Sequence, residues 1–307
     1  MRPSRIVSLL PSCTEMVCAL GCADLLKGRS HECDFPPEIR ARPVCASARL
    51  QREASSAPIG REVNSLLQRA LSIYQVDLDQ LRQLRPDLIL TQAQCEACAV
   101  TLSDLEKALA SDPDLHPKII SLSPARLADL WKDIQTLADA LGVPERGREL
   151  LFQLKNRVVD IIQKTCLLKR RPAVACLEWL DPLMAAGNWL PELVEIAGGG
   201  NLFGQAGQGS PGLEWETLRQ GDPDIIVLMP RGFDLERARR EAKKLEQNPV
   251  WKTLRAVKSG KVYLTDGRQY FNRPGPRLVD SLEILAAILQ PALFPAPPPG
   301  PSWQKLP

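Results

Sequence analysis

The chain has 307 residues, which is enough for two domains of ordinary size. Lys and Arg total 39 against 36 Asp and Glu, and this near balance gives no electrostatic case for nucleic-acid binding. Nine cysteines are too sparse in a chain of this length for a disulfide scaffold, and an odd number cannot all be paired within the chain. No apolar run approaches the roughly 20 residues that would span a bilayer.

Short apolar runs alternate with helical patterns in the first half of the chain, as is typical of βαβ units and a mostly parallel sheet. Residues 6–10 predict a first strand. Ser12 and Glu15 then have the spacing of a capping box, which predicts a helix that ends at Gly21. Further elements are predicted in chain order as strands at 88–90 and 118–120 and a helix opening at Ser123-Pro124 and running to about Leu141.

A long helix is predicted from about Arg146 to Lys169. The segment has no proline and no glycine after Gly147, and its apolar residues recur at helical spacing as Leu150, Leu151, Leu154, Val158, Ile161 and Ile162. About 23 helical residues span roughly 35 Å. Two interpretations are open, an ordinary long core helix and a rigid strut that joins two lobes, and the rest of the chain favours the strut.

The alternation of strands and helices starts again after Pro172. Strands are predicted at 173–177, 225–229 and 262–264, and helices at 191–198, 235–244 and 277–289. The tail, residues 291–307, is rich in proline and predicted to be extended or disordered. The predicted division is therefore an α/β lobe at 1–124, helices including the interlobe helix at 125–170, a second α/β lobe at 171–290, and the tail.

The second half of the chain repeats features of the first. Asp79 lies seven positions before Pro86-Asp87, which enters an apolar strand, and Glu216 lies seven positions before Pro223-Asp224, which does the same. Glu15 and Glu192 each stand six residues before a helix-ending glycine. The order of these matches predicts two Rossmann-like lobes with mostly parallel sheets, joined by the long helix, with a ligand cleft between them.

Several motifs resemble the class III periplasmic binding proteins, the binding components of cobalamin, siderophore and haem importers. They are residues 6–15 (IVSLLPSCTE), 31–37 (HECDFPP), 197–203 (AGGGNLF), 248–251 (NPVW) and 260–263 (GKVY). The similarity covers the chain up to about Leu289 and is closest to the cobalamin-binding branch. It implies a two-lobed protein with a single backbone helix that holds a corrinoid or metal chelate and hands it to an ABC transporter permease.

The resemblance also implies how the protein would dock. In the family, one acid on each lobe contacts basic residues of the permease, and Asp79 and Glu216 occupy the matching positions. The alternative is that both are ordinary first-turn acids, favoured by the helix macrodipole. The chain departs from the family because the first strand begins almost at Met1 and leaves no room for an export signal. We therefore expect a cytoplasmic location, or a periplasmic one if the sequence was trimmed.

A corrinoid is large, flat and partly apolar, so its site needs wide contact surfaces and a few polar anchors. Aromatic residues are only 5% of the chain, which makes their placement informative, although core packing is the alternative for each ring. Strand ends, loops and the resemblance together predict ligand contacts from Ser12, His31, Glu32, Cys33, Gln92, Gln94, Cys95, Trp179, Asp181, Trp189, Phe233, Tyr270, Phe271 and Arg273.

One set of residues has the chemistry of a metal site, namely His31, Cys33, Cys95 and Cys98. The Cys-x-x-Cys spacing suits a metal or a redox pair, and the histidine is a ligand type for zinc, iron or cobalt. Three uses stay open for these residues: a metal or redox site, lining of the ligand pocket, and inert packing.

No nucleophile elbow, zincin motif, Walker loop or dinucleotide fingerprint is present in the sequence. The sequence therefore favours a non-enzymatic binding protein for cobalamin or a related corrinoid, with no required cofactor and an ABC transporter permease as a possible partner. Two alternatives remain. One is a metal- or corrinoid-processing enzyme that uses the histidine–cysteine set, and the other is a binding protein for a siderophore, haem or another metal chelate.

Overall fold

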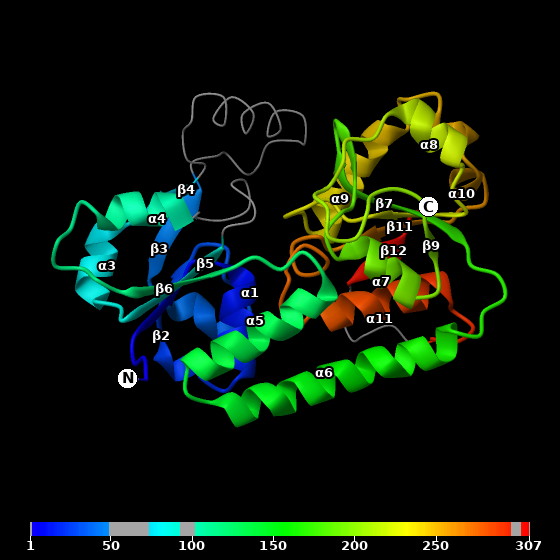
Figure 1. The fold of residues 1–307 in the computed structure, drawn as a ribbon. Helices are drawn as coiled ribbons and strands as arrows, with labels where there is room; N and C mark the ends of the chain where they lie inside the picture. The colour runs from blue at the N-terminus through cyan, green and yellow to red at the C-terminus, as the bar shows by residue number, and fades with distance from the viewer. Residues whose placement is uncertain (1, 49–73, 93–101, 296–301, 307) are drawn as a thin grey trace. The chain divides into compact units, whose positions relative to one another are not determined.

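The computed structural model describes residues 2–48, 74–92, 102–295 and 302–306. The described chain divides into two compact units (Figure 1). Unit 1 comprises residues 2–48, 74–92, 102–124 and 128–153, and unit 2 comprises residues 125–127, 154–295 and 302–306. Each unit holds one sheet with helices packed on it, which confirms the predicted two-lobed α/β fold.

The sheet of unit 1 has six strands in the order β4-β3-β2-β1-β5-β6. Its central strands are fully buried because β1 and β5 are short runs of apolar residues flanked by other strands. All pairings are parallel except that of β3 with β4. The strands are β1 (Ile6–Ser8), β2 (Leu26–Ser30), β3 (Val44–Ala48), β4 (Tyr74–Val76), β5 (Leu88–Gln92) and β6 (Lys118–Leu122).

The first helix of unit 1 begins differently from the prediction. Helix α1 (Pro11–Ala19) has Leu10 as its N-cap and Pro11 at its first position, and no side chain caps it. Ser12 lies inside the helix, so the predicted capping box is wrong: the fixed φ of proline starts the helix instead. The other elements are η1 (Ala23–Leu25), η2 (Pro37–Ala41), α3 (Leu78–Leu84), α4 (Leu102–Leu109) and α5 (Leu127–Ala140). Helix α5 starts three residues after the predicted Pro124.

The sheet of unit 2 has the order β12-β11-β10-β7-β8, with β9 also paired to β7. Strands β7, β10 and β11 are parallel neighbours. At the two edges, β8 pairs antiparallel with β7 and β12 pairs antiparallel with β11. The strand β12 belongs to the tail, so residues 303–305 are extended, as one of the two predicted alternatives had it, but they are paired into the sheet. The strands are β7 (Ala173–Leu180), β8 (Leu183–Ala185), β9 (Gly200–Asn201), β10 (Ile225–Leu228), β11 (Val262–Thr265) and β12 (Trp303–Lys305).

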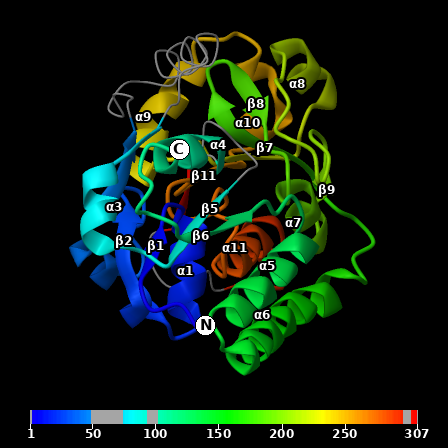
Figure 2. The same ribbon diagram turned by 60° about the vertical axis from the view of Figure 1, so that its left-hand side comes forward.

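The helices of unit 2 differ in how deeply they are buried. Helix α11 is buried along almost its whole length, whereas α9 presents a charged face to solvent. Figure 2 shows α11 lying beside α7, in agreement with their contacts. The elements are α7 (Leu190–Ile196), α8 (Trp215–Gly221), α9 (Leu235–Leu245), η3 (Trp251–Thr253), α10 (Arg255–Lys258) and α11 (Leu278–Leu289).

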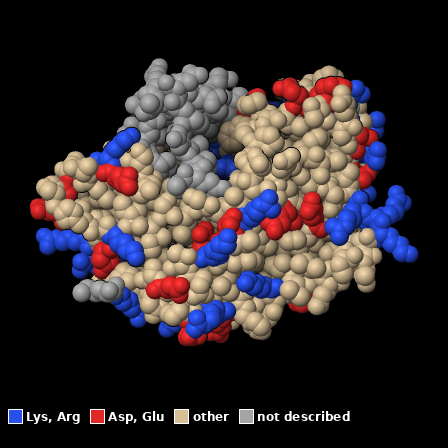
Figure 3. All heavy atoms as spheres, viewed as in Figure 1, with Lys and Arg blue, Asp and Glu red and all other residues tan. Residues whose placement is uncertain are grey.

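The predicted long helix exists as α6 (Pro144–Thr165), a single element of 22 residues. The boundary between the units falls inside it, after Gln153. Its role as a strut stays a prediction, as do the proposed domain limits and the cleft. Within the described ranges no helix is long and apolar enough to cross a membrane. On the face shown in Figure 3, acidic and basic side chains are interspersed.

The repeated acid–Pro–Asp pattern gives the same local structure in both units. Helix α3 ends at Arg85 and α8 ends at Asp222, each with a left-handed backbone. The aspartate that follows then binds the start of the unit's first strand: Asp87 accepts hydrogen bonds from the Ser4 and Arg5 amides, and Asp224 accepts one from the Ala173 amide. One local motif therefore enters a parallel strand in each unit.

Candidate ligand-binding site

The carboxyl ends of β7, β10 and β11 meet at one edge of the unit 2 sheet, because these three strands are parallel neighbours. Ligands of open parallel sheets bind at this edge. The loops that follow the strands are residues 181–182, 229–234 and 266–273. These loops are therefore the candidate site of unit 2.

Backbone hydrogen bonds tie the last two loops together. The Gly232 amide donates to the Gly267 carbonyl at 3.2 Å, and the Arg268 amide donates to the Phe233 carbonyl at 3.0 Å. The Asn272 side chain donates to the Met229 and Gly267 carbonyls at 3.2 and 3.0 Å. Two loops that are distant in sequence therefore form one frame at the edge of the sheet.

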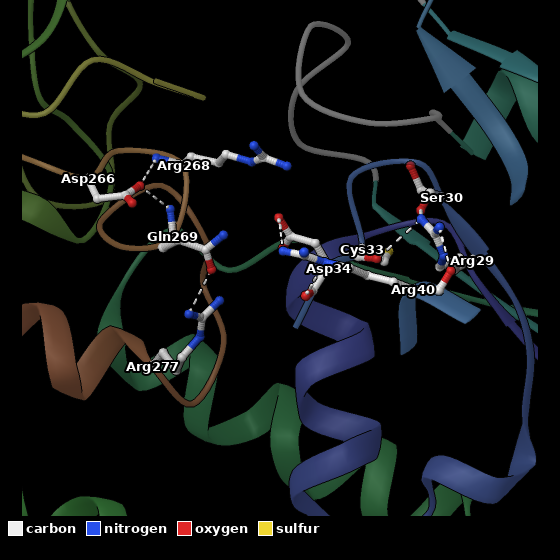
Figure 4. A network of polar contacts seen from close by, with 9 residues as sticks. All are labelled: Arg29, Ser30, Cys33, Asp34, Arg40, Asp266, Arg268, Gln269 and Arg277. Atoms are coloured by element: carbon white, nitrogen blue, oxygen red, sulfur yellow. Dashed lines mark hydrogen bonds and ion pairs between the residues drawn. The ribbon is translucent and has the colours of Figure 1, made fainter. Parts of the chain in front are cut away.

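Arginine is the dominant charged residue of this frame. Arg231 pairs with the buried Glu178 at 2.6 Å, and Arg277 donates to Gln269 Oε1 at 3.0 Å (Figure 4). The guanidinium groups come from Arg231, Arg237, Arg268, Arg273 and Arg277, and the carboxylates from Glu178, Asp181, Asp234 and Asp266. Guanidinium groups are planar and carry several donors, which suits a ligand that has phosphate, carboxylate or amide oxygens.

Asp266 organises the start of its loop. Its Oδ1 accepts hydrogen bonds from the Arg268 and Gln269 amides at 2.9 and 2.8 Å (Figure 4). Burial raises the pKa of this carboxyl above its ordinary value, and the two amide donors partly offset the effect. The loop is therefore held by a carboxyl group that is partly removed from water.

Two aromatic rings in this region are half-buried and present some surface. Trp179 lies 5.6 Å from Phe233 between ring centroids, and its Nε1 donates to the Asp181 carbonyl at 3.0 Å. Tyr270 lies below the Arg277 guanidinium at 5.5 Å. Flat apolar surface next to hydrogen-bond donors is what a large planar ligand requires.

Other aromatic residues predicted to contact the ligand lie in the interior of unit 2. Phe233, Phe271 and Trp189 are 2, 0 and 6% exposed. Trp189 Nε1 donates to the Phe271 carbonyl at 2.7 Å, and the Phe271 amide donates to Ser281 Oγ at 2.9 Å. In this conformation these three rings pack in the core, which was the alternative to ligand contact. Arg273 is also mostly buried, and Asp181 is exposed.

In unit 1, the loop after β2 carries the predicted residues His31, Glu32 and Cys33. His31 Nδ1 lies 3.1 Å from the Ala46 carbonyl, and its ring centroid lies 6.1 Å from that of Tyr74. Cys33 is fully buried, with its Sγ 3.6 Å from the Ser8 carbonyl, and the half-buried Glu32 donates its amide to Ser30 Oγ. Two of these side chains are therefore partly accessible and one is in the core.

Arg29 holds this loop in shape. Its guanidinium donates to the carbonyls of Ser30, Cys33, Arg40 and Arg42, and Figure 4 shows it lying under the loop. Ser12, in the first turn of α1, and Gln92, the last residue of β5, are also predicted ligand residues and are 2 and 5% exposed. Gln94, Cys95 and Cys98 lie outside the described residues.

The metal prediction rests partly on that undescribed segment. Across residues 2–48, 74–92, 102–295 and 302–306, no group of three His, Cys, Asp or Glu side chains is placed to hold a metal ion. His31 and Cys33 alone are two of the four predicted ligands. The prediction of a metal or redox site with Cys95 and Cys98 therefore stays a prediction.

The two predicted docking acids are exposed in the first turns of short helices. Asp79 pairs with Arg82 at 2.7 Å, and Arg82 also reaches Asp112 at 2.6 Å. Glu216 pairs with Arg219 at 2.5 Å. Hydrogen bonds from Arg219 and Gln220 lower the pKa of the Glu216 carboxyl to about 2. Both acids are thus accessible, and each is paired with an arginine of its own helix.

Four of the five arginines and Asn272 were not among the predicted site residues. For two of them the signal in the sequence was a basic residue two to four positions after a predicted strand end, as in Pro230-Arg231-Gly232 and Asp266-Gly267-Arg268. The prediction emphasised aromatic residues and so passed over these positions.

Comparison with known proteins agrees with this architecture. A family model described as "Periplasmic binding protein" matches residues 6–269. The chain is 25% identical to the vitamin B12-binding protein of Photorhabdus laumondii subsp. laumondii, over 92% of this chain and 86% of that protein. In fold, it is similar to the periplasmic vitamin B12 binding protein of Vibrio cholerae (TM-score 0.67, 20% identity, 94% of this chain and 98% of that one). It is also similar to a periplasmic heme binding protein from Pseudomonas aeruginosa (TM-score 0.70, 24% identity, 99% and 98%).

Proposed function

The chain belongs to the periplasmic binding protein family, and from this premise we propose that it binds cobalamin or a related corrinoid. The observation that carries the proposal is the frame of arginines and half-buried aromatic rings at the strand ends of unit 2. Arg231, Arg268 and Arg277 supply donors for the phosphate and amide oxygens of a corrinoid. Trp179 and Tyr270 supply flat surface for its apolar parts.

The relatives support a corrinoid without excluding other chelates. The likeness to a vitamin B12-binding protein extends over most of both chains. The likeness to a heme binding protein in fold makes haem the second candidate, and one feature of the site favours it: the same arginines suit the two carboxylates of haem. His31, half-buried after β2, is of a residue type that ligates iron.

The proposal includes a transporter partner. Asp79 and Glu216 would contact basic residues of an ABC transporter permease, one acid from each unit. Their support is that both are exposed and that both precede the same Pro-Asp strand entry. Substitution of Asp79 or Glu216 by Ala should weaken binding to the permease and leave ligand binding unchanged.

A titration tests the ligand. Purified protein is titrated with cyanocobalamin, haemin or a ferric siderophore, and the visible spectrum of each is followed. We expect saturation by cyanocobalamin at micromolar concentration and a lower affinity for the others. Saturation by haemin alone would replace the corrinoid with haem, and no saturation by any of the three would reject the proposal.

A matched pair of arginine variants tests the site. Arg268→Ala removes an exposed donor of the candidate frame, whereas Arg240→Ala removes an exposed arginine of α9 that pairs with Glu236 at 3.8 Å. We expect Arg268→Ala to raise the dissociation constant about tenfold, as befits the loss of one charged hydrogen bond. Arg240→Ala should have no effect; equal dissociation constants for the two variants would move the site away from these loops.

Two further predictions have their own tests. The cytoplasmic location, predicted from the sequence, is checked by immunoblotting cell fractions.

The enzyme alternative predicts stoichiometric zinc, iron or cobalt that is lost when Cys95 and Cys98 are both changed to serine. Elemental analysis of freshly purified protein measures this directly, and a metal-free protein that still binds a corrinoid would remove the enzyme from consideration.

A further inference from the structure

The C-terminal strand β12 completes one edge of the unit 2 sheet. It pairs antiparallel with β11, with Tyr263 opposite Lys305 and Thr265 opposite Trp303. The Leu306 amide donates to the Val262 carbonyl at 2.8 Å, and the Trp303 ring lies edge-on to Tyr263 at 5.7 Å. Residues that come after the last helix therefore bind the full length of β11.

The last hydrogen bond of this pairing reaches the candidate ligand loop. The Asp266 amide, the first after β11, donates to the Ser302 carbonyl at 2.9 Å. Ser302 is 3% exposed, so this bond is shielded from water. The tail thus holds the chain at the point where the strand ends and the loop begins.

Asp266 passes this constraint to the next residues of the loop. Its side chain accepts from the Arg268 and Gln269 amides (Figure 4). Its carbonyl accepts from the Tyr270 amide at 3.0 Å. Gln269 Oε1 in turn accepts from Arg277, whose guanidinium lies over Tyr270. A series of hydrogen bonds therefore runs from Ser302 through Asp266 and Gln269 to Arg277, whose guanidinium contacts the Tyr270 ring.

We propose that the tail strand, residues 302–306, is a positioning element for the ligand loop and acts through Asp266. The effect on ligand affinity rests on the proposed function, but the effect on the loop does not. The loop is held on its other side by the loop that follows β10, through Gly267 and Asn272. Without the tail, β11 becomes a sheet edge, and Asp266 loses the acceptor that fixes its backbone.

Hydrogen exchange of the ligand-free protein tests the effect on the loop. The full chain is compared with a chain that ends at Pro301. We expect the amides of Asp266, Arg268 and Gln269 to lose protection about tenfold, which corresponds to about 1.4 kcal/mol, and the amides of β7 and β10 to keep theirs. Loss of protection confined to Val262–Thr265 would show that the tail protects only strand β11 and does not position the loop, and this result would overturn the proposal.

A second variant decides the case in which shortening the chain unfolds unit 2. Asp266→Ala keeps the tail and the backbone bond to Ser302 but removes the side-chain acceptor. We expect the Gln269 amide to lose protection in this variant while β11 stays paired to β12, and the Arg268 amide to lose less, because it also donates to the Phe233 carbonyl. Unchanged protection at both amides would refute the role of Asp266, whatever the shortened chain does.

Trp303→Ala is the matched control, because it removes the ring contact with Tyr263 and leaves the backbone pairing in place. Its loop amides should keep their protection; loss equal to that of the shortened chain would assign the effect to ring packing instead.

Cyanocobalamin affinity, measured by the visible titration, should fall about tenfold in the shortened chain. If the full chain binds no corrinoid, the proposed function fails, whereas the exchange result still decides the role of the tail.

Discussion

Asp133 on helix α5 is a carboxyl group in an unfavourable position. One of its oxygens is buried and finds no hydrogen-bond partner within the described ranges of the chain. Burial, with a smaller effect from Asp129, raises the pKa of this group from its ordinary 3.8 to about 6. The folded state therefore binds a proton at this position more tightly than the unfolded chain does.

This shift predicts how stability depends on pH. The stabilisation from protonated Asp133 is complete below about pH 4, is lost as the pH rises to about 6, and stays lost above that. We expect this group to lower the free energy of unfolding by about 2 kcal/mol over that interval. Asp133→Asn should remove this fall, as measured by urea unfolding at pH 4, 5, 6 and 7. Asp160→Asn, at an exposed position on α6, should follow the wild type; a parallel curve for Asp133→Asn would contradict the prediction.

Gly267 lies where two loops of the candidate site approach each other. A Cβ atom at this position would lie 2.2 Å from the Pro230 carbonyl oxygen and 3.0 Å from the Met229 carbonyl carbon. Both are backbone atoms, so neither can turn away as a flexible side chain would. The two loops can meet only if this residue has no side chain.

Gly267→Ala should therefore separate the loops. We expect the free energy of unfolding to fall by about 2–3 kcal/mol and ligand affinity to fall with it. Gly209→Ala is the control, because a Cβ there meets nothing within 4 Å, and it should change stability by less than about 0.5 kcal/mol. Urea unfolding of both variants measures the difference, and equal values would show that the loops accommodate the methyl group.

At this scale, much of the candidate site could not be predicted from the sequence. Burial of Phe271 depends on Trp189 and Ser281, which are distant in sequence and meet it only in the folded unit. The arginines Arg231 and Arg268 follow different strands, and only the parallel pairing of β10 and β11 brings them to one edge. The strand-end rule indicated the loops that meet at this edge of the sheet but not the arginines within them.

Among the elements, α6 and α11 are joined by a charged cluster. Arg157 of α6 donates to Asp280 at 2.5 Å and to both oxygens of Glu283 at 2.8 and 2.7 Å. All three side chains are partly buried, and the hydrogen bonds to the two acids raise the pKa of the guanidinium above its ordinary value. A cluster of this kind fixes the register of the two helices.

Removing the central arginine leaves two carboxylates facing each other. We expect Arg157→Ala to lower the free energy of unfolding by about 2 kcal/mol, because hydrogen bonds to charged groups contribute about 1.5–3 kcal/mol each in gross terms and solvent screens part of that here. Arg148→Ala removes an exposed pair with Glu145 on the same helix and should cost less than about 0.5 kcal/mol. Thermal and urea unfolding of both variants provide the comparison, and an equal loss in both would show that the cluster does not hold the helices together.

Elements with a continuous apolar pattern could be predicted, and elements without one could not. Strands β1, β5, β7 and β10 are buried runs and were found. Strand β2 alternates buried with half-buried residues and contains Gly28, and no strand was predicted there. In the fold the glycine is needed for packing, because a Cβ at this position would lie 2.5 Å from Cys45 Sγ. Strand β12 follows a proline-rich segment and is a strand only because the edge of β11 offers it partners.

For the whole molecule, the repeated acid–Pro–Asp pattern was the most informative feature, because the same aspartate hydrogen bond recurs at the first strand of each unit. The crossings between the units after Pro124 and Leu127 lie just before α5 and at its first residue. The chain also passes between the units inside α6, after Gln153. A helix keeps its hydrogen bonds through such a boundary, whereas hinge closure is absorbed by loop or element-terminal residues. This placement limits how the chain can respond to a ligand.

We therefore expect ligand binding to change the radius of gyration by less than the error of small-angle X-ray scattering. A double variant, Gln153→Gly with Asn156→Gly, weakens α6 at exposed positions next to the boundary, at a cost of about 1 kcal/mol per glycine. Because a weakened helix bends more easily, this variant should show a measurable decrease in radius when saturated with cyanocobalamin, whereas the wild type should not. A large decrease in the wild type would mean that α6 does not resist bending, and the interpretation of this helix as a strut would then be wrong.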